Sequence, residues 1–188
     1  MPDPDVRRAE IADAAITVAG TAGMRGLTHR AVDVRAGLPT GSTSYYFRTR
    51  AALLQAAVRR LAELDRELFR PGDDFAGSIA AALDDSLSRH RIRTTARYLF
   101  LLEAARDPDL TSIREVGREF REYAAEMLAS ADVPEPRLRA NTLVAALDGL
   151  VFDRLANTGG LTAPKPGTPA SRADLRRAVE LLLQIAQR

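Results

Sequence analysis

The chain has 188 residues, of which 46% are hydrophobic and 28% are charged, and its formal net charge is +2. This is the composition of a folded protein, and with no cysteine and only two histidines it excludes disulfides, thiol chemistry, thiolate metal sites and a multi-histidine metal centre. No apolar run approaches the ~20 residues of a membrane span, and the polar N-terminus has no secretion core, so we expect a cytoplasmic protein without a metal or other cofactor.

Along the chain, apolar residues recur every three or four positions, which indicates amphipathic helices, and no run alternates as in a β-strand. The first helix is predicted to close at Gly20 and Gly23. Thr28 is expected to cap a short second helix. Gly37 is expected to end that helix in a left-handed conformation, which costs a residue with a Cβ about 1 kcal/mol or more.

The next two helices follow without a long loop. Thr40 is expected to cap a very short third helix that runs to about Phe47. Thr49 is expected to cap a longer fourth helix, which is broken by Pro71-Gly72 because proline cannot continue a helix.

Five more helices are predicted in the rest of the chain, with breaks at 107–108, 132–134 and 159–160. The proline-rich segment 161–171 is expected to be a loop, and Ser171 is expected to cap the last helix. The sequence therefore predicts an all-α protein of about nine helices.

Basic residues are in excess near the N-terminus. Residues 51–188 carry 20 basic and 20 acidic side chains, whereas residues 20–50 hold five arginines against the single acid Asp33. Such a local excess is what a polyanionic partner requires. Arginine-rich usage alone also produces it, since Lys165 is the only lysine, so charge by itself leaves both explanations open.

The segment Leu27–Leu54 has the features of a DNA-reading helix-turn-helix. It reads LTHRAVDVRAGLPTGSTSYYFRTRAALL, which is two short helices joined by a glycine-containing turn in a basic surround. Residues 40–43 are small and polar, so the third helix can lie deep in a major groove. Tyrosines and arginines follow it, at the height where phosphates would pass.

This segment resembles the TetR family of bacterial transcriptional regulators. The matching positions, in the family's spacing, are Leu27-Thr28, Ala36-Gly37-Leu38, Tyr46-Phe47, Arg50 and Leu53-Leu54. The resemblance covers about residues 7–58. It implies a helix-turn-helix DNA-binding domain over residues 1–50 and a helical ligand-binding and dimerisation domain over residues 51–188. It also implies a homodimeric regulator, more often a repressor than an activator, that a small-molecule effector releases from a two-fold-related double-stranded DNA operator.

The resemblance further implies which residues meet DNA. Thr40, Ser42 and Thr43 would contact base edges. The residues implied at phosphates or completing the interface are Thr28, Arg30, Gly41, Tyr45, Tyr46, Arg48 and Arg50. A capping role explains Thr28 equally well, and His29 is expected to lie exposed on the second helix.

The sequence departs from the family pattern in two places. Asp33 stands where many members have alanine. A carboxylate there needs a partner or an exit to water, so we expect Asp33 to accept hydrogen bonds from the start of the third helix, near residues 40–42. Thr43-Ser44 replaces a frequent Leu-Tyr, so the tyrosine contact to phosphate is either absent or taken over by Tyr45.

In the second domain the resemblance implies a dimer interface on the last two helices and an effector pocket. The expected interface comprises Leu143, Leu147, Leu150, Leu175, Leu182 and Ile185. The expected pocket comprises Phe100, Glu103, Phe120, Tyr123, Asp148 and Phe152. Packing within one protomer explains the same apolar periodicity, and a solvated face or an internal ion pair explains the carboxylates.

Other classes of protein explain less of the sequence. An enzyme is not expected, because His90 lies in a polar helix end without a second histidine nearby and Asp84-Asp85 cannot share one helix face. The alternative that stays open is a helical small-molecule carrier or interaction protein that never binds DNA. It leaves the Leu27–Leu54 motif unexplained.

Overall fold

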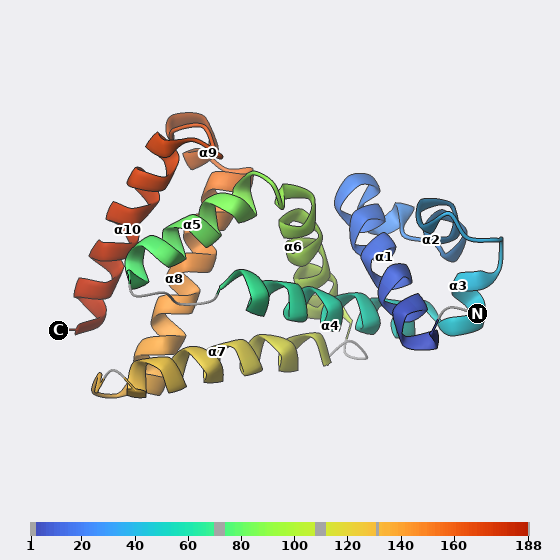
Figure 1. Ribbon diagram of the computed structural model, residues 1–188, viewed down its shortest axis with the longest axis horizontal. Coiled ribbons are helices and arrows are strands. Elements are labelled where there is room, and N and C mark those ends of the chain that lie inside the picture. The colour runs from blue at the N-terminus through green and yellow to red at the C-terminus, as the bar shows by residue number, and fades with distance from the viewer. Residues whose placement is uncertain (1–2, 70–73, 108–111, 131, 188) are drawn as a thin grey trace. The chain divides into compact units, whose positions relative to one another are not determined.

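The computed structural model describes residues 3–69, 74–107, 112–130 and 132–187, and all of their side chains except those of 112–114, 116 and 185–187. Every regular element in these ranges is a helix (Figure 1). They are α1 (Pro4–Gly26), α2 (His29–Ala36), α3 (Ser42–Tyr46), α4 (Arg50–Leu68), α5 (Phe75–Leu87), α6 (Arg91–Arg106), α7 (Ser112–Ser130), α8 (Pro136–Ala156), α9 (Gly159–Thr162) and α10 (Pro169–Gln187). The all-α prediction is confirmed, and α9 is a single extra turn that spans the predicted break at 159–160 and the first two residues of the predicted loop 161–171. In these ranges no helix is both long and apolar enough to cross a membrane.

The helices form two compact units. The first comprises Met1–Asp65 and Ile92–Val116, and the second comprises Arg66–Arg91 and Gly117–Arg188. The first unit therefore holds α1 to α3 together with most of α4 and α6. The functional division at residue 50 stays a prediction.

A single apolar core holds the first unit together. α1 packs against α2, and α2 against α3 (Figure 1). The buried core residues are Ile11, Ala14, Ala15, Ile16, Val18 and Ala19 of α1, Leu27, Val32, Phe47, then Leu53, Leu54, Ala57, Val58 and Leu61 of α4, and Ala96, Phe100 and Ala104 of α6. Val32 of α2 and Phe47 at the end of α3 belong to this core, so it anchors the two short helices.

The end of α1 differs from the prediction. Gly20 does not close the helix, which continues until Gly23 interrupts it at φ 71° and ψ 178°. Gly20 instead allows a close approach of α6, because a Cβ at this position would lie 2.2 Å from the carbonyl oxygen of Ile92. Its role is packing, which the local sequence pattern did not reveal.

In the second unit, α5, α8 and α10 lie side by side (Figure 1). A carboxylate with no solvent exposure, Asp84 of α5, joins α5 to the start of α10. It accepts hydrogen bonds from Gly167 N at 2.9 Å, Ser171 Oγ at 2.7 Å and Arg172 Nε at 3.2 Å. These bonds satisfy a buried charge that would otherwise be costly.

The predicted cap of the last helix is wrong. α10 begins at Pro169, and Thr168 caps it, because Thr168 Oγ1 accepts a hydrogen bond from Ser171 N at 3.2 Å. Proline is favoured in a first helical turn, where its missing N–H has no partner to lose. The side chain of Ser171 instead turns inward to Asp84 and is buried.

Candidate nucleic-acid interface

The second helix begins and ends where the sequence predicted. Thr28 Oγ1 accepts a hydrogen bond from Ala31 N at 3.2 Å, so it caps α2. Gly37 ends the helix at φ 65° and ψ 32°, the left-handed region that glycine enters without strain. Leu38 N then donates to Asp33 O at 2.9 Å and closes the turn toward α3.

Asp33 fixes the start of α3 from the side of α2. Its Oδ2 accepts a hydrogen bond from Gly41 N at 2.8 Å, and its Oδ1 accepts one from Thr43 N at 2.7 Å. The first N–H groups of a helix have no partner within the helix, and Gly41, which flanks the start of α3, has no side chain to supply one. The prediction that Asp33 caps the third helix is confirmed.

The ionisation of Asp33 follows from this geometry. Burial opposes the charged form, but hydrogen bonds from Thr43 and Gly41 and the nearby His29 outweigh it, so the pKa of Asp33 lies below its ordinary value of 3.8. The carboxylate is therefore charged at neutral pH, and it presents a full negative charge to the N-terminus of α3. That is the sign which a helix N-terminus favours.

The exposed face of α3 differs from the prediction in two residues. Thr40 lies outside the helix and is exposed, and it is not the cap. Thr43 has no exposed surface, so the prediction that it contacts a base edge is wrong. The residue that takes this outward place is Ser44, beside the exposed Tyr45. A five-residue helix has only one turn of periodicity, which is too little to show from sequence which side faces inward.

Aromatic and basic side chains surround this face. Tyr45 is 80% exposed, whereas Tyr46 is half-buried and its ring lies 5.9 Å from the guanidinium carbon of Arg8. The two tyrosine rings meet edge to face at 5.2 Å. Arg48 is exposed. Of these, Tyr45 and Arg48 have the surface to reach a phosphate.

Arg50 has protein partners in this structure. Its guanidinium donates to Glu103 Oε1 of α6 at 3.0 Å and to Met24 O of α1 at 3.2 Å. The predicted phosphate ligand thus pairs with a predicted pocket residue. Because 53 residues separate Arg50 from Glu103, no local sequence pattern could predict this contact.

His29 is half-buried rather than exposed. Its Nε2 lies 2.7 Å from Phe47 O, so it joins the start of α2 to the end of α3. Together with Asp33 it holds the short third helix at both ends. A helix of five residues would be marginal alone, and these two side chains fix its orientation on the core.

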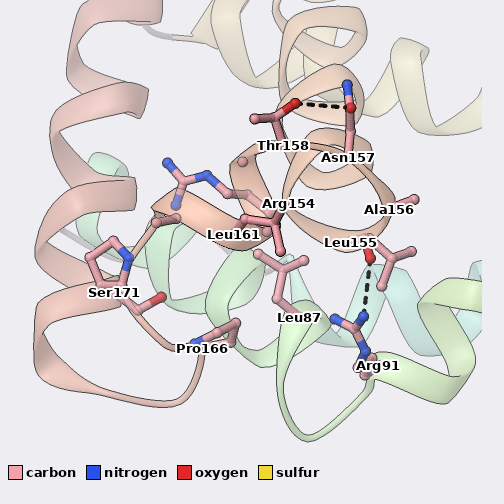
Figure 2. Close-up of a pocket in the computed structure, with 14 residues that line it drawn as sticks. Leu87, Arg91, Arg154, Leu155, Ala156, Asn157, Thr158, Leu161, Pro166 and Ser171 are labelled. Carbon is pink, nitrogen blue, oxygen red and sulfur yellow. Dashed lines mark hydrogen bonds between the residues drawn. The ribbon is translucent and has the colours of Figure 1, made fainter.

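The six predicted pocket residues are distributed over both units. Phe100 is buried in the core of the first unit, and Glu103 belongs to the same unit. In the second unit, Phe120 meets the ring of Phe69 edge to face at 5.6 Å, and Phe152 is 44% exposed. Two cavities of the second unit, one of which Figure 2 shows, are lined by none of the six. The effector pocket stays a prediction.

The predicted dimer residues divide into two groups. Leu143 and Leu175 are buried inside the protomer, at 5% and 0% exposure, so the prediction that they face a partner is wrong. Leu147, Leu150 and Leu182 are half-buried, and the side chain of Ile185 lies outside the described part. The apolar period was correct, but it marks mainly the side of each helix that packs within the chain.

Known proteins resemble the chain over most of its length. Residues 70–185 match the family model of the tetracyclin repressor-like, C-terminal domain. The HTH-type transcriptional regulator BetI of Stenotrophomonas maltophilia (strain R551-3) is 28% identical over 155 residues, which cover 77% of this chain and 79% of that protein.

Solved structures extend the likeness. The multidrug binding protein EbrR complexed with imidazole is 33% identical, with a TM-score of 0.65 and coverage of 97% of this chain and 96% of that one. A member of the TetR family from Streptomyces coelicolor A3 (SCO1917) is 33% identical, with a TM-score of 0.69 and coverage of 94% and 97%. EbrR has also been crystallised with ethidium, at 33% identity, a TM-score of 0.66 and coverage of 94% and 98%.

Proposed function

The chain belongs to the TetR family of transcriptional regulators, and from this we propose that it binds a two-fold-related DNA operator as a homodimer in the cytoplasm and leaves it when a small organic effector binds. The observation that carries the proposal is the exposed surface at α3, which Asp33 fixes and where Ser44 and Tyr45 of the helix and the preceding Thr40 are exposed. The complex of the similar EbrR with ethidium supports an organic effector.

The proposed contacts follow from exposure. Thr40, Gly41, Ser42 and Ser44 would face base edges in the major groove, where small side chains permit close approach. The proposed phosphate contacts are Thr28, Arg30, Tyr45 and Arg48, with Tyr46 and Arg50 at the margin. Two such helices in one dimer would enter successive grooves about 34–36 Å apart.

Removing Arg48 is expected to weaken operator binding and its dependence on salt. Each phosphate neutralised adds about 0.9 to the slope of log affinity against log salt. Because Arg48→Ala removes one cation from each of two subunits, it should lower the slope by about 1.8. Fluorescence anisotropy on the promoter DNA flanking the protein's own gene measures this over a salt series. Arg106→Ala, which removes an exposed arginine of α6, is the matched control and should leave the slope unchanged.

One result would contradict the role of Arg48, and another would contradict DNA binding itself. An Arg48→Ala slope equal to that of the wild type would remove Arg48 from the interface. A folded wild-type dimer that selects no sequence from a genomic library would leave the helical carrier as the better explanation of the fold.

The proposed dimer interface is a stripe on the outward side of α8. Its residues, all exposed, are Leu138, Thr142, Ala145, Gly149, Phe152 and Ala156. They recur every three or four positions, so they share one helix face. The stripe is continuous from end to end of α8, with small residues at its middle, where two helices can approach closely.

Gly149→Arg is expected to convert the dimer to a monomer that still folds. A Cβ at Gly149 meets no atom of the protomer within 4 Å, so the substitution is sterically free in one chain. In the dimer it would bury an unpaired charge, which costs about 3–5 kcal/mol. Sedimentation velocity at micromolar concentration measures the association state. Gly117→Arg, where a Cβ is equally unobstructed, should stay dimeric, and a dimeric Gly149→Arg would place the interface elsewhere.

A further inference from the structure

An apolar side chain lies on the exposed side of α2. Val34 is 74% exposed, and among the large apolar side chains that the structure describes only Leu161 and Tyr45 are exposed more. Helix propensity does not favour valine at such a position, because its branched side chain loses rotamer freedom in a helix. Neither packing within the chain nor helix propensity therefore explains a valine here.

The hydrogen bonds of Asp33 show which side of α2 faces α3. They come from Gly41 N and Thr43 N at the start of α3. A helix turns by about 100° per residue, so Val32 and Val34 point to opposite flanks of Asp33. Val32 has no exposed surface and belongs to the core of the first unit. Val34 therefore lies on the outer flank, beside the contact between α2 and α3 and away from the core.

Arg30 shares the outer flank of α2 with Val34. The two residues are four positions apart, so their side chains lie on one helix face, and Arg30 is exposed as well. Arg35 is also exposed, but it lies two positions after Asp33 and so points away from α3. The outer flank thus presents a cation and, about 6 Å further along the helix toward the start of α3, an apolar side chain.

The surroundings of Val34 favour a negatively charged partner. Between residues 20 and 50 the single acid is Asp33, and this residue is 2% exposed and bonded to α3. The start of α1 lies at the other end of α3, where Arg8 is 5.9 Å from the ring of Tyr46. The exposed acids at that start are Asp3, Asp5 and Glu10. A polyanion can therefore approach Val34 without meeting a carboxylate from α2, α3 or the turn between them.

We propose that Val34 contacts the C5-methyl group of a thymine in the operator, with Arg30 at the adjacent phosphate, and this rests on the proposed DNA binding. Thymine is the base whose major-groove edge carries a methyl group, and apolar side chains are the ones that contact it. In a helix-turn-helix the first helix crosses the DNA backbone, and the start of the second helix lies among base edges. Val34, beside the start of α3, is at the groove end of α2, and Arg30 is one turn back at the backbone end.

This contact would add a preference that the polar residues of α3 do not supply. Cytosine has no methyl group at C5, so Val34 would favour thymine over cytosine at the position that it meets. The operator is therefore expected to carry a thymine at the equivalent position of each half-site.

Replacement of each operator thymine by deoxyuridine tests the contact, because uracil differs from thymine only in lacking the C5-methyl group. The operator is first selected from a genomic library with the wild-type protein, and its affinity is then measured by fluorescence anisotropy. At one thymine of each half-site, deoxyuridine should weaken binding of the wild type about fourfold, which is the effect of losing one buried methyl group.

Val34→Ala identifies the thymine involved. The side chain is exposed, and alanine is the better helix former, so this variant should fold. It should bind the thymine and deoxyuridine operators equally within about twofold at that position, and its discrimination at any other thymine should match that of the wild type. Arg35→Ala, on the side of α2 that points away from α3, is the matched control and should retain the fourfold preference.

The possible failures are distinguishable. If no deoxyuridine weakens binding of the wild type, or if Val34→Ala keeps the wild-type preference at every thymine, the thymine contact is refuted while DNA binding stands. If Val34→Ala weakens binding to all these operators by the same factor, Val34 lies against the DNA backbone and the proposal is overturned. A wild-type protein that selects no sequence would refute the proposed function, and the thymine contact with it.

Discussion

Asp33→Asn is expected to lower the free energy of unfolding by about 3 kcal/mol and to abolish specific DNA binding. Hydrogen bonds to a charged group contribute about 1.5–3 kcal/mol each, and a buried donor left unpaired costs about 1–3 kcal/mol. Asparagine can accept from only one of the N–H groups of Gly41 and Thr43 and turns its own N–H₂ toward the other. Urea denaturation measures the loss. Glu126→Gln, at an exposed carboxylate, is the control and should change stability by less than about 0.5 kcal/mol.

The stability lost in Asp33→Asn is also expected to depend on pH. Because the folded-state pKa of Asp33 is lowered from its ordinary value of 3.8, its ionised form contributes stability that is fully present above that ordinary value. That stability is lost as the pH falls through the lower, folded-state pKa. The gap in unfolding free energy between wild type and Asp33→Asn should therefore be constant from pH 7 to 5 and shrink below about pH 4. A gap independent of pH would mean that the charge of Asp33 is not what stabilises α3.

The second large effect is expected from a single methyl group. Gly20→Ala places a Cβ 2.2 Å from Ile92 O and 2.7 Å from Ile92 Cγ2. Since one of these atoms belongs to the backbone, a side-chain rotation cannot relieve the clash, and α1 and α6 must move apart. Overpacking of this kind costs about 1–3 kcal/mol, and we expect a loss near the upper limit in urea denaturation.

Gly117→Ala provides the comparison for that experiment. It also lies inside a helix, and its Cβ would meet no atom within 4 Å. Alanine is favoured over glycine in a helix interior by about 0.5–1 kcal/mol, so this variant should be more stable than the wild type. The two glycines should thus change stability in opposite directions. Equal effects would show that Gly20 is not a contact point.

Features that depend on neighbours in the chain could be predicted from the sequence. The cap at Thr28 and the left-handed Gly37 need only a few adjacent residues, and both are present. Asp33 was predicted to accept hydrogen bonds from the start of α3 because a carboxylate at this position needs a partner or an exit to water. The capping role expected of Thr40 was wrong, because the side chain of Asp33 supplies the bonds that a local cap would make.

Features that depend on distant contacts could not be predicted. Gly20 looks like a helix stop until Ile92 is placed against it, and Arg50 looks like a free phosphate ligand until Glu103 reaches it. The dimer-interface residues predicted on α8 and α10 were partly wrong for a related reason. A helix that packs within its own chain and also against a partner has two apolar faces of the same period, and periodicity does not say which is which. Burial of Leu143 and Leu175 assigns their face to the protomer.

The ties between Asp84 and the start of α10 also bear on the order in which the nascent chain acquires its structure. Domains form from the N-terminus during synthesis, at about 5–20 residues per second. The first unit has all its parts once residue 116 has been made. Asp84 must wait for Gly167 and Arg172, more than 80 residues later. A ribosome that stalls or terminates before residue 167 would therefore leave a folded DNA reader joined to a helix whose buried carboxylate has no bonding partners at α10. Premature truncation should thus produce chains whose second half is open to proteolysis while the first half resists it.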